Sequence, residues 1–162
     1  MNANANASAK SKSTWHGRPV ELGKGAEENG FANMLLAMLS QNFEAKPHKL
    51  ADLRAMHGTV ALVADDAGVA VTLRFMRGVV VIESGVRGVP DVCVRGTTDA
   101  VMSMSNMPLT FGLPFPDPRD KEAKAAYESI NLALKKGEIH IFGMLRHFFF
   151  MQRFTRIMSV NG

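Results

Sequence analysis

The chain has 162 residues, which corresponds to one domain that is long enough to bury a sizeable hydrophobic core. Hydrophobic residues make up 46% and charged residues 21%, a globular composition that excludes wholesale disorder. The net charge of +4 is too small to indicate nucleic-acid binding, and the single cysteine, Cys93, excludes an intramolecular disulfide framework and a CxxC metal site. The 11 methionines stand out, because methionine suits surfaces that accept varied apolar partners.

The first 24 residues differ from the rest of the chain. Residues 1–24 are rich in Asn, Ala, Ser and Lys and show no periodic apolar pattern, which predicts a flexible leader before a single domain at 25–162. The leader lacks the apolar stretch of a signal peptide. The longest uncharged run, 100–116, is interrupted by proline and falls short of the roughly 18 apolar residues of a membrane-spanning helix. We therefore expect a soluble, cytoplasmic protein with peripheral contact at a membrane.

Helical periodicity gives way to alternation near Gly58. Apolar residues at three- and four-residue spacings predict a helix that Asn29 or Asn33 caps and that ends before Pro47, followed by a shorter helix at 47–56. Beyond Gly58, alternating apolar and polar residues predict strands at 59–64, 69–75, 79–83 and 91–95. Their short hairpin spacing predicts an antiparallel meander.

The second half of the chain returns to helices. A short helix capped by Thr97 or Thr98 is expected to end near Met104, and a proline-rich loop follows at 106–118. The remaining expected elements are a helix at 121–136, a fifth strand at 138–142 and a final helix at 144–158. The sequence thus predicts an α+β fold: a five-stranded, mostly antiparallel, twisted sheet that helices cover on one face.

Three segments in this order resemble the sterol carrier protein type 2 (SCP2) domain. Residues 58–63 resemble the family's first strand, residues 90–96 with 98–101 resemble an acidic strand start and the helix behind it, and residues 136–143 resemble its glycine-bracketed last strand. The resemblance covers roughly residues 30–160. It implies a lipid-binding fold with an apolar tunnel between sheet and helices, in which family members hold sterols, fatty acyl chains or phospholipids.

Two features depart from the family pattern. Residues 106–135 replace a short link between the middle helix and the last strand, which changes the shape of the cavity entrance. Phe142 stands where the family often carries a lysine, which removes a charge near that entrance.

The sequence contains no recognisable catalytic motif. There is no Gly-x-Ser-x-Gly, no His-Glu-x-x-His and no Walker-type phosphate loop. The spacing of the five histidines and Cys93 does not bring three or four metal ligands together. We therefore expect no catalytic residue, no metal and no cofactor, although an enzyme that modifies a lipid, with His57 or His147 as base, remains a third interpretation.

Methionine and phenylalanine are the expected ligand contacts. Burying each methylene of a lipid gains about 0.8 kcal/mol, so a chain of about fifteen carbons gains about 12 kcal/mol before ordering costs. Apolar walls alone can therefore bind a lipid. The predicted lipid-binding residues, of which two belong to a loop expected to form a lid, are Met34, Met38, Phe75, Met102, Met104, Phe111, Phe115, Ile139, Ile141, Leu145 and Phe148.

The C-terminal segment carries more apolar surface than one buried helix face requires. Residues 139–162 contain no Asp or Glu, and arginines flank the surplus phenylalanines. This pattern predicts contact with an anionic membrane, whereas the competing interpretation is a helix buried against a partner chain. Nucleic acid is not expected, because the basic residues are few and interleaved with Phe and Met. The predicted membrane-contact residues are Arg146, Phe149, Phe150, Arg153 and Arg156.

The sequence as a whole favours non-catalytic binding of an apolar lipid such as a sterol, acyl chain, phospholipid or isoprenoid, for carrying or presenting it. The alternative is an accessory protein of a membrane-lipid or isoprenoid-quinone biosynthesis complex, which would have a lipid-pathway protein as its partner. There the C-terminal helix would be a docking surface.

Overall fold

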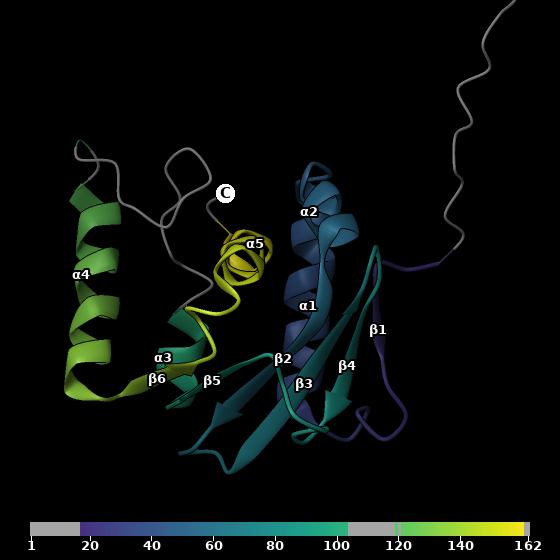
Figure 1. The fold of residues 1–162 in the computed structure, drawn as a ribbon, viewed down its shortest axis with the longest axis horizontal. Coiled ribbons are helices and arrows are strands. Elements are labelled where there is room, and N and C mark those ends of the chain that lie inside the picture. Colours follow the sequence, from purple (N-terminus) through teal and green to yellow (C-terminus); the bar gives the residue numbers. More distant parts are fainter. Residues whose placement is uncertain (1–16, 104–118, 120, 161–162) are drawn as a thin grey trace, which may run out of the picture.

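A computed structural model describes residues 17–103, 119 and 121–160. Its centre is a six-stranded sheet in the order β1-β4-β3-β2-β5-β6 (Figure 1). The strands are β1 (Val20–Leu22), β2 (His57–Ala64), β3 (Val69–Met76), β4 (Val80–Ser84), β5 (Val92–Gly96) and β6 (Ile139–Phe142). The helices are α1 (Gly30–Ala45), α2 (Lys49–Ala55), α3 (Thr98–Ser103), α4 (Lys121–Lys136) and α5 (Phe148–Met158). The structure therefore has the predicted α+β architecture, with one strand more than expected.

The additional strand lies in the segment predicted as a flexible leader. Val20 is buried, and β1 pairs in parallel with β4 at the edge of the sheet. The prediction that the leader runs to residue 24 is corrected at this point. A three-residue strand leaves too little alternation in the sequence to be recognised, and its partner lies about sixty residues further along the chain.

The predicted four-strand meander holds for only three strands. β2, β3 and β4 form antiparallel pairs as expected, but β5 crosses back over the sheet and pairs in parallel with β2. β6 then adds to β5 in antiparallel orientation. Because β5 leaves the side of β4 free, β1 can occupy that edge.

The core lies between one face of the sheet and the helices. Val60 and Leu62 of β2 and Leu73 and Phe75 of β3 are buried at alternate positions, although Ala61 and Thr72, on the opposite face, are buried as well. These side chains form one cluster with residues of α1, α2, α3 and α5. The strands thus place their large apolar side chains in the core on one side, which agrees with their period-two pattern.

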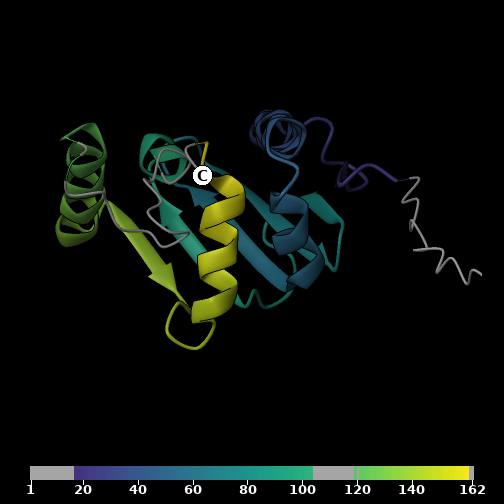
Figure 2. The same ribbon diagram turned by 90° about the horizontal axis from the view of Figure 1, so that it is seen from above.

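Helix α4 stands apart from the other helices. Both views place it at the β6 edge of the sheet (Figures 1 and 2). Its described contacts are with β6 and α3, and Ala133 packs against the core cluster. Leu132 and Leu134 are exposed, so α4 presents apolar side chains to solvent as well as to the body of the protein.

Candidate functional site

The inner side of β5 and β6 forms an apolar wall. Val94 and Ile139 are fully buried, whereas Ile141 of β6 and Met102 of α3 are partly buried and pack against the core cluster. The two strands approach closely because glycines flank their pairing: a Cβ atom at Gly96 would collide with the carbonyl oxygen of Glu138. Of the predicted lipid-binding residues, the structure brings Met102, Ile139 and Ile141 to this end of the sheet.

Next to this wall, aromatic rings fill the space between sheet and helix. Phe75 of β3 contacts Phe150 and Phe154 of α5 edge-on, with ring centroids 5.6 and 6.1 Å apart. Phe154 is fully buried and Phe150 only partly. Phe75 was predicted to line a lipid cavity, and here its ring packs against protein. Phe150, predicted to touch a membrane, is half covered by the same contact.

Met34 and Met38 lie in another part of the molecule. Both belong to α1, which packs against β1, β3, β4, α2 and α5, whereas Met102 and Ile141 lie with β5 and β6. Met34 is exposed and Met38 is partly buried against the core. Their helix packs against β3, which carries Phe75, while Met102 and Ile141 belong to α3 and β6. Met104, Phe111 and Phe115 lie outside the described residues.

The turn between β6 and α5 exposes a group of large apolar side chains. Leu145 is 88% exposed, and Phe148, which contacts the ring of Phe149 edge-on at 5.7 Å, is 52% exposed. The expectation that Leu145 and Phe148 face the interior is therefore corrected: the helix starts later than predicted, and its first turn points into solvent. We call this group, Phe142, Met144, Leu145, Phe148 and Phe149, the apolar knob.

Phe149 was predicted to contact a membrane, whereas Phe142 and Met144 were not. Phe142 lies on the outer side of β6, where its ring stacks with His140 at a centroid distance of 6.3 Å. The only available signal was alternation: Ile139 and Ile141 point inward, so Phe142 must point outward.

The predicted membrane-contact arginines differ in their partners. Nε of Arg156 donates a hydrogen bond to Asp52 of α2 at 3.0 Å, and Nε of Arg153 lies 3.9 Å from the same carboxylate. The expectation that three arginines have no acid nearby is thus wrong for these two, because the fold brings α2 to α5. Arg146 is exposed and has no ion pair with any described residue.

Side chains of α1 and α2 hold the C-terminal end of α5. Nδ2 of Asn42 donates to the carbonyls of Ile157 and Met158, each at 3.0 Å, and Nζ of Lys49 donates to the carbonyl of Ser159. The last carbonyls of a helix lack partners within it, so these donors satisfy them. Lys49 is fully buried, and this burial, with the nearby charge of Lys46, lowers the pKa of its ammonium to about 8.

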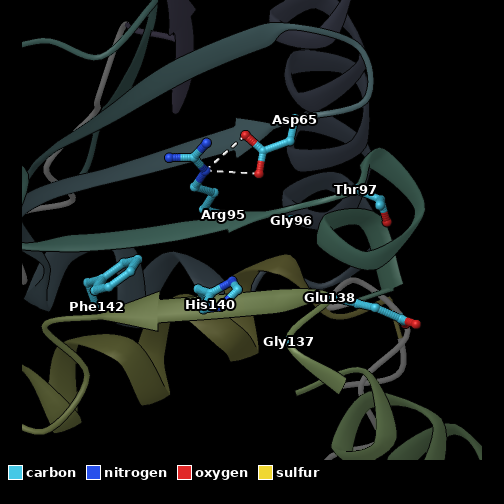
Figure 3. A pocket seen from close by; sticks show the side chains of 8 residues that line it. All are labelled: Asp65, Arg95, Gly96, Thr97, Gly137, Glu138, His140 and Phe142. Carbon is cyan, nitrogen blue, oxygen red and sulfur yellow. Dashed lines mark hydrogen bonds and ion pairs between the residues drawn. The ribbon is translucent and has the colours of Figure 1, made fainter. Parts of the chain in front are cut away.

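A pocket of about 450 Å³ opens on the outer face of the sheet, beside the start of α3 and the end of α4 (Figure 3). Nε of Arg95 donates to both carboxylate oxygens of Asp65 at 2.9 Å on one side, and His140 and Phe142 lie on the other. The Arg95 guanidinium is thus already paired with an acid. This open, mixed pocket is not the apolar tunnel that the resemblance implies.

The two candidate bases, His57 and His147, lie in different surroundings. Nε2 of His147 lies 3.9 Å from Oδ1 of Asp91, while the Thr59 hydroxyl donates to Oδ2 of the same aspartate at 3.2 Å. His57 is exposed at the start of β2. Within residues 17–103 and 121–160, no three His, Cys, Asp or Glu side chains are grouped to hold a metal ion. No helix in the described part of the chain is long and apolar enough to cross a membrane.

A twisted sheet with helices over one face, closed by a last strand and a C-terminal helix, defines the SCP2-like fold. Among solved structures, the chain is similar to the UbiJ-SCP2 ubiquinone synthesis protein, with a TM-score of 0.52 and 14% sequence identity over 82% of this chain and 93% of that one. This likeness shows the fold and confirms the resemblance found in the sequence.

A second similar structure is a conserved hypothetical protein from Thermus thermophilus, suggested to be a sterol carrier protein. It aligns with a TM-score of 0.40 and 12% identity over 77% of this chain and 88% of that one. No model of a known protein family matches the sequence, and no curated protein matches it.

Proposed function

We propose that the protein binds an apolar lipid without transforming it, on the inner side of β5 and β6. The observation that carries this proposal is an apolar layer that the described residues cover only in part. Met102 of α3, Ala133 of α4, Ile141 of β6 and Phe150 of α5 all pack against the core, yet none is fully buried. The SCP2-like fold supports the same location.

The energetics of this site require no polar motif. A lipid chain that covers partly exposed apolar side chains gains about 0.8 kcal/mol for each methylene removed from water. Met102 adds an unbranched, polarizable side chain that can adapt to a flexible ligand. We propose that Met104 adds to this wall and that Phe111 and Phe115 control entry. Replacing Phe111 and Phe115 by serine should then slow lipid uptake more than it lowers thermal stability.

Native mass spectrometry of the gently purified protein tests lipid binding directly. We expect a co-purified lipid, and uptake of a fluorescent fatty acid or sterol by protein stripped of it. Met102→Trp and Ile141→Trp should reduce uptake because the indole occupies the site, whereas Met76→Trp, on the exposed side of β3, should leave it unchanged. Absence of both co-purified lipid and uptake would contradict the proposal, as would turnover of the bound lipid.

The likeness to a ubiquinone synthesis protein favours one second function. In this alternative, the domain holds an isoprenoid-quinone precursor for partner enzymes and is an accessory protein of their complex. Deleting the gene should then lower the quinone content of the cell and accumulate a precursor, and native mass spectrometry should show a retained protein partner. Unchanged quinone content would exclude this alternative and leave lipid carriage.

A further inference from the structure

Among the described residues, the apolar knob is the densest group of exposed large apolar side chains. Five large apolar side chains lie within eight residues of chain, and each is at least 40% exposed. Figure 2 shows the turn between β6 and α5, which carries Met144 and Leu145, projecting beyond the sheet and α5. Concentrated exposed apolar surface of this kind marks a site of contact with another molecule or a membrane.

The charges on the knob's own stretch of chain are positive or neutral. Between residues 139 and 160 there is no Asp or Glu, and Arg146 lies in the middle of the knob without an ion pair among the described residues. The acids that the structure places near it are Asp91, 3.9 Å from His147, and Asp65 and Glu138, which line the same pocket as Phe142. Asp91 already accepts hydrogen bonds from Thr59, and Asp65 accepts them from Arg95. The knob therefore combines apolar tips with one available cation.

We propose that the apolar knob inserts into the interface of a lipid bilayer, where Arg146 pairs with an anionic headgroup. A projecting set of apolar tips suits insertion between lipids better than it suits a flat protein interface. A symmetric contact between two copies of this surface would bring Arg146 towards its own counterpart, with like charges and no acid from the knob to separate them. Anionic headgroups supply the missing negative charge.

The ion pairs of α5 determine how such binding depends on salt. Because Asp52 holds Arg156 and lies close to Arg153, the sequence-based expectation of three available arginines reduces to Arg146. Membrane attachment should thus be mainly apolar, and raising salt should weaken it only a few-fold. This inference goes beyond internal lipid binding and does not depend on it.

Flotation with vesicles of phosphatidylcholine, with and without phosphatidylglycerol, tests the insertion. The double variant Leu145→Ser/Phe149→Ser should bind both kinds of vesicle about tenfold more weakly or worse. Arg146→Gln should weaken binding to the anionic vesicles about fivefold and leave binding to the neutral ones unchanged. The matched control Val86→Ser/Val89→Ser, which removes two exposed apolar residues between β4 and β5, should bind as the unaltered protein does. Equal binding by the knob variant and the unaltered protein would overturn the proposal.

A fluorescent label shows which residues enter the bilayer. With the single cysteine replaced as Cys93→Ser, a bimane at Leu145→Cys should shift to the blue on adding vesicles, whereas the same label at Val89→Cys should not. An unshifted label at residue 145 would refute insertion. So would light scattering that shows a dimer which Leu145→Ser/Phe149→Ser dissociates, because the knob would then be covered by a second copy.

Discussion

At its C-terminal end, α5 places Phe154, Ile157 and Met158 inside the core, whereas at its first turn Phe148 and Phe149 lie in solvent. The two ends belong to one eleven-residue helix and are similarly apolar in sequence. They differ in what surrounds them: α1 and α2 pack around the last turns, and the sheet ends near the first.

This difference shows that apolar composition alone does not assign a helix to the core. The buried end is fixed by polar groups as well, because Asn42 and Lys49 donate to its terminal carbonyls and Asp52 binds Arg156. No corresponding side-chain bond caps the first turn at His147. One end is therefore a structural anchor, and the other is a surface that is available for contact.

Truncating one phenylalanine at each end of α5 should give the largest difference in the free energy of unfolding between two variants. Phe154→Ala should lower the free energy of unfolding by about 3–5 kcal/mol, because it leaves a cavity next to Phe75. Phe149→Ala should change it by less than about 0.5 kcal/mol, since the ring is mostly in water. Urea denaturation followed by circular dichroism measures both, and equal losses would show that Phe149 also belongs to the core.

The hydrogen bonds of Asn42 at the buried end of α5 provide the second comparison of stability. Asn42→Ala leaves two buried carbonyls without their donor and should lower the free energy of unfolding by about 2 kcal/mol. Asn33→Ala is the matched control on the same helix, because Asn33 also donates to two backbone carbonyls but lies in solvent, where water can replace it. If the two variants lose equal stability in urea denaturation, the hydrogen bonds of Asn42 are not what stabilises the C-terminal end of α5.

Much of the fold could be predicted because its signals are local. The alternation of β2, β3 and β4 and the spacing of apolar residues in α1 each lie within a few turns of chain. The parallel pairings of β1 with β4 and of β5 with β2 could not be predicted, since they join segments that are distant in sequence and follow from no turn.

The site was predicted less well, for a related reason. Alternation placed Ile139 and Ile141 on the inner side of β6, but apolarity alone could not separate the buried Phe154 from the exposed Phe149. Nor could it find the partner of Arg156, because Asp52 lies about a hundred residues earlier. Contacts between distant segments decide which apolar or charged residues remain available for function.

The smallest expected change in the free energy of unfolding comes from the titration of Lys49. It tests whether the ammonium group at the C-terminal end of α5 is buried. Its pKa falls from 10.5 to about 8 in the folded protein, mainly through burial. Between these values the unfolded chain holds more protons than the folded one, so stability must rise as pH rises. From about pH 7 to pH 9 the free energy of unfolding should increase by about 1 kcal/mol.

Cys93 titrates in the opposite sense, because burial raises the pKa of its thiol and stability then falls as the unfolded thiol ionises. The measurement is therefore made with Cys93→Ala as the background, by urea denaturation at several pH values. Adding Lys49→Met keeps a long apolar stem but removes the titrating group, so the rise with pH should disappear. A rise that persists in that variant would assign the titration to another group, and a flat profile in the background protein would show that the ammonium at the end of α5 is not desolvated.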